Sequence, residues 1–235
     1  MTDIPPPKAE STVRLRDNGA GVEGRRLGLK GGEVLLAVNG RPFRGTDDML
    51  ARRFDARGGK PLALTFARGM DEFVVLAETH KLGRWEIVAA GPLPTEDGTR
   101  IDPDTLRNFE VMRADTGVYD LYPETPSLTA MLAAPVWLLQ MRLWVPWATV
   151  VAALAAAALV TPWLSGAVWM AAGLWVRRAG AFFVRADRRG RGLAWEGMIA
   201  ARTEAEAHQK HRARYPEDRN IFAPAPAGKG EAEAA

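Results

Sequence analysis

The sequence of 235 residues contains no cysteine, which excludes disulfides, thiolate metal sites and a cysteine nucleophile. Histidine is nearly absent as well, with only His80, His208 and His211. His208 and His211 have the i, i+3 spacing of one helix face, but no third metal ligand lies near them in the sequence. The motifs His-Glu-x-x-His, Gly-x-Ser-x-Gly and the P-loop are also missing. We therefore expect neither an enzymatic activity nor a bound cofactor or metal.

Charge is missing from one long stretch, although a quarter of all residues are charged. Residues 143–176 read LWVPWATVVAALAAAALVTPWLSGAVWMAAGLWV. As one straight helix this stretch would be about 50 Å long, whereas the hydrocarbon core of a bilayer is about 30 Å thick. Thr161-Pro162 interrupts the run, because proline removes a backbone donor and disfavours helix at the preceding residue. The sequence therefore predicts a transmembrane helical hairpin with arms at 143–160 and 163–184.

Arginines border the uncharged run on both sides. A hairpin keeps both basic flanks in the cytoplasm, as the positive-inside rule prefers, whereas a single span would export one side. Because no secretory signal is present, we expect a multi-pass protein of the bacterial inner membrane with both termini cytoplasmic. The arginines would act mainly as topogenic signals, with binding of lipid head groups as the other possibility. These candidates are Arg142, Arg177, Arg178, Arg185, Arg188, Arg189 and Arg191.

Composition divides the rest of the chain into segments. The N-terminal part alternates short apolar runs with glycine-rich turns, and a stretch rich in Pro, Asp, Thr and Gly follows it. We expect disorder at residues 1–10, a β-rich domain at 11–90, a linker at 91–127, an interfacial helix or third span at 128–142, a basic strand and helix at 185–215, and a disordered tail at 216–235. A capping box at Thr203 to Glu206 would open the last helix.

The most informative part of the N-terminal domain is GLKGGEVLLAVNGRPF, residues 28–43. It predicts a short apolar strand followed by a tight turn at Asn39-Gly40, since both residues tolerate positive φ. Thr46 is the expected N-cap of a helix, TDDMLARRF, which glycines terminate. Further strands are expected in PLALTF and EFVVL, residues 61–66 and 72–76.

This order of GLKGGEVLLAVNGRPF, TDDMLARRF and GKPLALTFARG resembles a bacterial PDZ domain over roughly residues 12–78. The resemblance implies an α+β fold, with a small PDZ-like β-rich domain and one main helix in addition to the transmembrane hairpin. Two features depart from the family: Glu33 replaces the usual Asp, and the segment before Gly28 is short. That segment carries the family's carboxylate-binding loop. The peptide-binding candidates are Gly19, Ala20, Gly21, Val22, Met49 and Arg53, and the alternative is a PDZ-like domain that binds no peptide.

A second resemblance covers roughly residues 127–212. PVWLLQMRLW, the hairpin and RRGRGLAWEGMIAARTEAEAHQ are similar to an uncharacterised family of small bacterial inner-membrane proteins, from which no activity carries over. The expected function is a non-enzymatic inner-membrane adaptor whose PDZ-like domain recruits a protein partner. The alternative is an accessory or structural subunit of a larger membrane protein complex. The expected partners are a protein and the lipid bilayer, and not nucleic acid.

Overall fold

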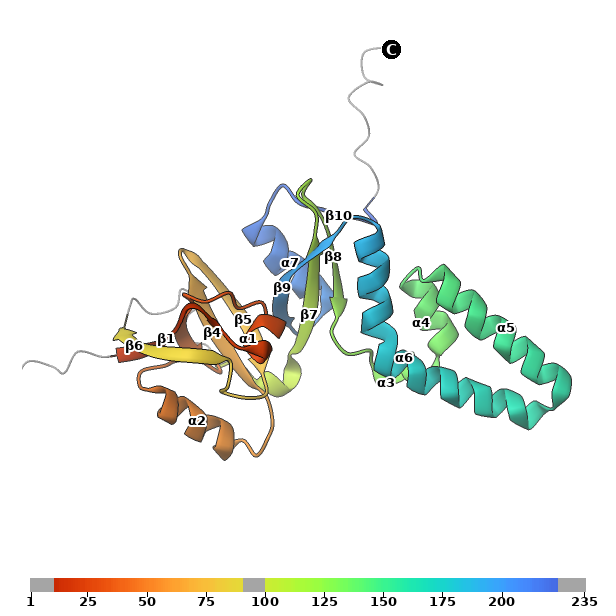
Figure 1. Ribbon diagram of the computed structural model, residues 1–235, viewed down its shortest axis with the longest axis horizontal. Coiled ribbons are helices and arrows are strands. Elements are labelled where there is room, and N and C mark those ends of the chain that lie inside the picture. Colours follow the sequence, from red (N-terminus) through yellow and green to blue (C-terminus); the bar gives the residue numbers. More distant parts are fainter. Residues whose placement is uncertain (1–10, 91–99, 224–235) are drawn as a thin grey trace, which may run out of the picture. The chain divides into compact units, whose positions relative to one another are not determined.

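The computed structural model describes residues 11–90 and 100–223 (Figure 1). The disorder expected for residues 1–10 falls outside these ranges, as does that expected for the tail at 224–235. The first part of the expected tail, residues 216–223, is described and contains a short strand at Arg219–Asn220. The chain divides into two compact units. Unit 1 contains the residues up to Glu110 together with Glu196–Arg214, and unit 2 contains Val111–Trp195 and the residues from Tyr215.

Unit 1 is built on an antiparallel sheet with the strand order β5-β4-β2-β1-β6, to which β3 adds beside β2. The tight turn expected at Asn39-Gly40 is confirmed, since φ is 53° at Asn39 and 74° at Gly40 and the turn joins β2 to β3. The elements of this part are β1 (Ser11–Ala20), α1 (Val22–Arg26), β2 (Val34–Val38), β3 (Arg41–Pro42), α2 (Asp47–Ala56), β4 (Leu62–Arg68), β5 (Asp71–Ala77) and β6 (Gly83–Ala89).

The core of unit 1 lies between the sheet and α2. Helix α2 begins after Thr46, as expected, and buries Leu50 and Phe54 at a spacing of four residues. Leu15, Leu35, Leu64 and other strand residues complete this cluster, and β9 contributes Met198 from much later in the chain. Unit 1 is therefore assembled from two separate stretches of sequence.

A second sheet has the strand order β10-β8-β7-β9, with β10 parallel to β8. Strands β7 and β8 lie in the stretch expected to be a linker. Each buries four consecutive residues, 109–112 in β7 and 119–122 in β8, so both faces of these strands are covered. Helix α7 has the expected cap, since Thr203 Oγ1 accepts a hydrogen bond from the N–H of Glu206 at 3.2 Å. The elements are the 3-10 helix η1 (Pro103–Thr105), β7 (Arg107–Arg113), β8 (Val118–Pro123), β9 (Ala194–Ala201), α7 (Glu204–Arg214) and β10 (Arg219–Asn220).

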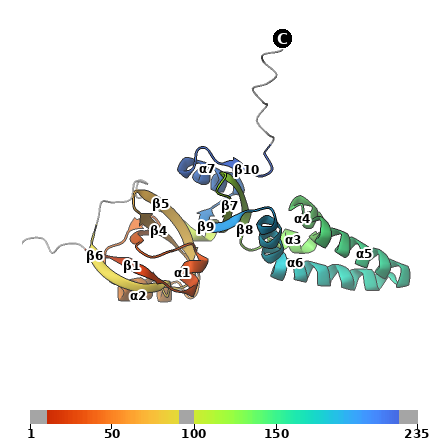
Figure 2. The same ribbon diagram turned by 45° about the horizontal axis from the view of Figure 1, so that its top comes forward.

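The helical part of unit 2 contains the expected hairpin turn. Helix α5 ends at Val160 and α6 begins at Pro162, and the two helices run side by side in both ribbon views (Figures 1 and 2). The less exposed positions of α5 and its N-cap residue include a stripe with alternating spacings of four and three, at Leu143, Trp147, Val150, Leu154 and Ala157. The helices are α3 (Leu128–Leu132), α4 (Ala134–Gln140), α5 (Trp144–Val160) and α6 (Pro162–Gly190).

The predicted transmembrane hairpin is wrong. Within the described ranges, no helix is both long enough and apolar enough to cross a membrane. Helix α5 has 17 residues, fewer than the ~20 that a span needs. Helix α6 is longer but continues through Arg177 and Arg178 to a basic end. The expectations of a membrane-spanning fold and of a multi-pass inner-membrane protein are corrected accordingly, and the described residues form an α+β fold with two sheets.

Candidate functional site

The loop expected to bind a peptide carboxylate lies at the end of β1, where β6 already pairs with the chain. Gly19 and Ala20 belong to β1, and Ala20 pairs with Gly83 of β6. The N–H of Gly21 donates to the carbonyl oxygen of Leu82 at 2.7 Å. A ligand at this loop would therefore compete with backbone pairing that the protein makes internally.

The remaining peptide-binding candidates lie on two helices. Val22 begins α1 and is 75% exposed, and Met49 on α2 is 46% exposed. The guanidinium carbon of Arg53 lies 5.0 Å from the centroid of the Phe43 ring, a cation–π distance. Peptide binding by this set remains a prediction.

The basic candidates of unit 2 do not act as one group. Arg177, Arg178 and Arg189 are exposed on α6, and Arg185 on the same helix is half-buried. Arg142, before α5, and Arg191, directly after α6, are exposed as well. Arg188 is 1% exposed and donates to Asp120 Oδ2 at 2.5 Å, so that it forms part of the interior. The guanidinium groups of Arg142, Arg188 and Arg191 lie 4.3, 4.7 and 5.8 Å from the centroid of the Phe222 ring. At least these three arginines therefore have structural contacts within unit 2.

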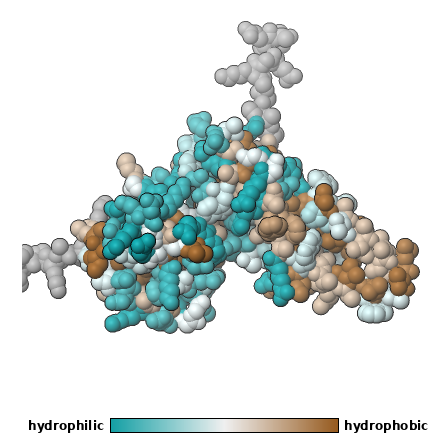
Figure 3. All heavy atoms as spheres, in the orientation of Figure 1, coloured by the Kyte–Doolittle hydropathy of each residue, from teal (hydrophilic) through white to brown (hydrophobic). Residues whose placement is uncertain are grey.

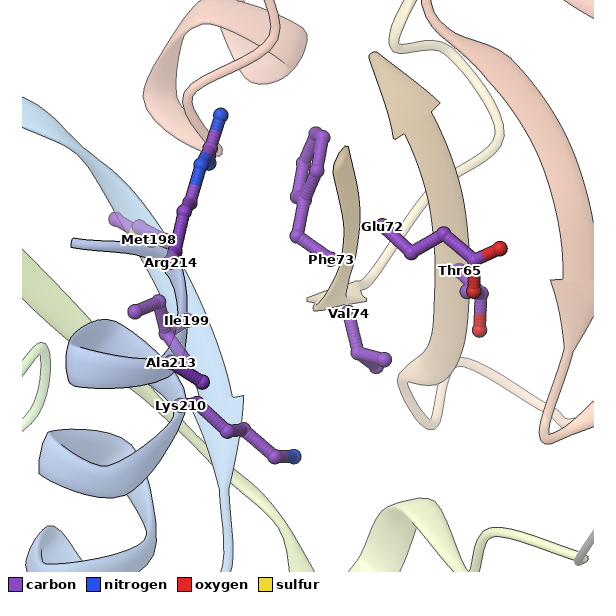
Figure 4. A pocket seen from close by; sticks show the side chains of 9 residues that line it. All are labelled: Thr65, Glu72, Phe73, Val74, Met198, Ile199, Lys210, Ala213 and Arg214. Atoms are coloured by element: carbon purple, nitrogen blue, oxygen red, sulfur yellow. The ribbon is translucent and has the colours of Figure 1, made fainter. Parts of the chain in front are cut away.

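A cavity of about 230 Å³ lies within unit 1, beside the end strand β5 (Figure 4). Its β5 wall includes Glu72, Phe73 and Val74, three consecutive residues. Because consecutive strand residues point to opposite faces, a cavity that touches all three lies along the edge of the strand. The other residues that line it are Thr65 of β4, Met198 and Ile199 of β9, and Lys210, Ala213 and Arg214 of α7.

The direction of the β5 backbone groups follows from the hydrogen bonds around it. The amide of the Asn108 side chain pairs with Leu76 from outside the sheet, donating to its carbonyl oxygen and accepting from its N–H, both at 2.9 Å. Since backbone groups of alternate residues point to the same edge, the N–H and C=O of Val74 also point outward. Ala63 of β4, the partner of Leu76, exchanges hydrogen bonds with Asn39 on the side away from β5. Ala63 and Leu76 therefore both point their backbone groups away from each other, which agrees with this alternation.

Val74 therefore presents an unused donor and acceptor at the edge where the cavity lies. Among the described residues, neither its N–H nor its C=O has a hydrogen-bond partner on this side. A backbone amide in such a position bonds either to water or to another strand. The edge at Val74 is thus chemically suited to an added strand, whereas Asn108 occupies the same edge at Leu76.

The ring of Phe73 is held in the cavity wall by two cations. The guanidinium carbons of Arg68 and Arg214 lie 5.0 and 5.9 Å from its centroid. Arg68 is fixed by Glu33, whose Oε1 accepts from Arg68 Nη2 at 2.8 Å. Burial raises the pKa of Glu33, but hydrogen bonds from the N–H of Lys30, from Arg68 and from the N–H of Gly31 outweigh it, so the pKa lies below its usual value. Arg214 is paired with Asp71 Oδ2 at 2.8 Å.

The cavity is small. Its volume equals that of about eight water molecules in the bulk liquid, which is below the range typical of small-molecule sites. The lining is mostly apolar, and its cations are engaged: Lys210 Nζ donates to the Ala200 carbonyl at 3.0 Å and lies 2.9 Å from Glu206 Oε1. In the described part of the chain, no group of three or more His, Cys, Asp or Glu residues is arranged to hold a metal ion.

Comparisons with protein-family models, with curated proteins and with solved structures find no match. The sequence correctly predicted the strand at 72–76, which forms most of β5. The sequence did not indicate that this strand lies at the edge of its sheet. The opposite wall of the cavity comes from β9 and α7, more than a hundred residues later, and only the folded chain places them beside β5.

Proposed function

We propose that this protein is a non-enzymatic adaptor that binds a segment of a partner protein through unit 1. The observation that carries the proposal is the outward-pointing backbone of Val74 beside a mostly apolar cavity. Strand edges of this kind bind peptides by backbone pairing, while pockets beside them select side chains. The resemblance of residues 12–78 to PDZ domains supports the same class of function, although the edge concerned is that of β5.

The test is a selection of displayed random peptides of seven residues on the immobilised full-length protein. Enriched peptides are then synthesised and titrated by calorimetry. We expect dissociation constants of about 1–100 μM, corresponding to about −8 to −5.5 kcal/mol, as is usual for a short extended ligand. A selection that enriches no sequence, or peptides that show no heat of binding, would count against the adaptor function.

A second candidate, a structural subunit of a larger protein complex, is favoured by the α5–α6 hairpin. No charge occurs between Leu143 and Val176, and large apolar side chains are exposed, among them Leu159 at 90%, Trp163 at 74% and Met170 at 75%. Figure 3 shows hydrophobic residues concentrated over these helices on the face in view. An apolar surface of this extent is typical of a contact with another protein, here the helices of a second subunit.

Size-exclusion chromatography with light scattering distinguishes the two candidates. A structural subunit taken from its native source migrates with a mass well above 25.6 kDa, and replacing Leu159 and Met170 by Gln returns it to the mass of one chain. An adaptor that binds peptides keeps its affinity for them after the same replacement, because the substituted residues belong to unit 2.

A further inference from the structure

We infer that the cavity beside β5 receives one apolar side chain of an extended partner segment, which pairs with Val74 as an added strand. This inference rests on the proposed function and specifies its site, ligand class and mode of binding. The ligand is a stretch of protein in β conformation with a medium-sized apolar residue, such as Val, Ile, Leu or Met, opposite Val74.

The protein already contains a group that bonds to the outer edge of β5 as a paired strand would. The carboxamide of Asn108 donates to and accepts from Leu76, which is how a residue of a paired strand would bond there. Val74 is the next residue whose backbone groups point to the same edge. A partner residue opposite Val74 can therefore exchange two hydrogen bonds with it, and Asn108 stops the added strand from extending past Leu76.

The side-chain part follows from the geometry of paired strands. Residues directly opposite each other point to the same face, so the partner residue lies beside the Val74 side chain, on the face that Val74 shares with its β4 partner Thr65. The cavity lining also includes four apolar residues, Phe73, Met198, Ile199 and Ala213. None of these four side chains can pair with a polar group that the ligand would bury there. An apolar anchor is therefore preferred, and its size is limited by a cavity of about 230 Å³.

The cations at the cavity leave the ligand little to gain from acidic residues. Lys210 is engaged by Glu206 and the Ala200 carbonyl, and Arg214 is engaged by Asp71. Affinity should consequently depend weakly on salt, in contrast to binding that is governed by charge complementarity. The expected ligand is thus recognised by backbone pairing and by shape.

The first test removes the outward donor at Val74. The variant Val74→Pro has no N–H at this position, yet the ladder with β4 uses other residues, and proline is tolerated on edge strands when its nitrogen faces outward. The matched control, Val74→Ala, keeps the N–H and loses the same apolar contacts. With an enriched heptapeptide as probe, we expect Val74→Pro to bind at least about tenfold more weakly than Val74→Ala.

A complementary test leaves the protein unchanged and methylates the backbone nitrogens of that heptapeptide one at a time. Strand addition predicts an alternating pattern, in which methylation weakens binding about tenfold at every second residue and has little effect between them. This measurement does not depend on whether Val74→Pro folds. A flat or irregular pattern would overturn the inference, even if the peptide binds well.

The third test fills the cavity. Ala213→Leu places a larger side chain in the lining, and Ala205→Leu on the same helix, where Ala205 is exposed and outside the lining, is the control. We expect Ala213→Leu to weaken the heptapeptide by about tenfold and Ala205→Leu to leave its affinity unchanged. Equal affinities for both variants would show that the peptide binds elsewhere, which contradicts the inference while leaving an adaptor function intact. If no peptide is enriched at all, the proposed function itself fails.

Discussion

The buried Arg188 of unit 2 offers the sharpest test of how the fold is stabilised. Its guanidinium donates to Asp120 Oδ2 at 2.5 Å, to a carboxylate oxygen of Asp187, and to the Met141 carbonyl at 3.1 Å. Arg188 is 1% exposed and Asp120 is 5% exposed. The pair therefore has little access to solvent, and removing one partner leaves the other charge buried without compensation.

Replacing Arg188 by Met keeps the length of the side chain and removes its charge. Breaking a buried ion pair in this way costs about 3–5 kcal/mol, whereas replacing both partners by apolar residues is often nearly neutral. We therefore expect Arg188→Met to lower the free energy of unfolding of unit 2 by about 3–5 kcal/mol. The double variant Arg188→Met with Asp120→Leu should recover most of that loss.

Urea unfolding followed by tryptophan fluorescence is the appropriate assay, since every tryptophan except Trp85 lies in unit 2. The coupling between the two sites is obtained from the two single variants and the double variant. A loss below about 1 kcal/mol for Arg188→Met would refute the reasoning, because it would mean that Asp120 is not left as an uncompensated buried charge. A double variant as unstable as the sum of the single ones would refute it as well.

Two further predictions concern unit 1. Because the pKa of Glu33 is lowered from 4.5 in the folded state, its contribution to stability is present above that value and is lost as the pH falls below it. Urea unfolding between pH 7 and pH 3 (approximately) should reveal a pH dependence that Glu33→Gln reduces, and equal slopes for both proteins would contradict this. A Cβ on Gly24 would lie 2.1 Å from the Leu82 carbonyl oxygen, so Gly24→Ala should destabilise unit 1 by about 1–3 kcal/mol in thermal and urea unfolding. Gly190→Ala, whose added methyl meets no atom within 4 Å, is the control and should be neutral or slightly stabilising.

The features that the sequence predicted correctly depend on neighbouring residues. The turn at Asn39-Gly40 requires two residues that tolerate positive φ. The turn after α5 follows from Pro162, because proline has no N–H to continue the backbone hydrogen bonds of that helix. The cap at Thr203 needs only a hydroxyl near the first free N–H groups of α7. Such signals act over a few residues and need no knowledge of the rest of the fold.

The features that were missed depend on distant parts of the chain. The stretch at 91–127 has the composition of a linker, yet β8 forms there, in the same sheet as β9, residues 194–201. The apolar run was assigned to a membrane because its length and flanking charges match a hairpin of spans. Helix α6 instead continues past Arg177 to Gly190 as one helix, and a hydropathy pattern does not reveal where a helix stops.

The candidate site was missed for the same reason. The strand that contains Val74 was predicted, but whether its edge is paired depends on the order of strands in the sheet. The PDZ resemblance implies a ligand site at the loop around Gly21 instead, where the N–H is already bonded to the carbonyl oxygen of Leu82. Sequence patterns identify which strands form and leave their neighbours undetermined.

The division of unit 1 between two stretches of sequence has a consequence for its synthesis. Met198 belongs to its core, and β9 and α7 form one wall of the cavity. The ribosome makes these elements only after about a hundred further residues, which at 5–20 residues per second takes roughly 5–20 s. During that interval the sheet that ends at β5 lacks β9 and α7 beside it, and its edge is open to other chains. The nascent protein is therefore most exposed to mispairing at the same edge that, once the chain is complete, offers Val74 to a partner.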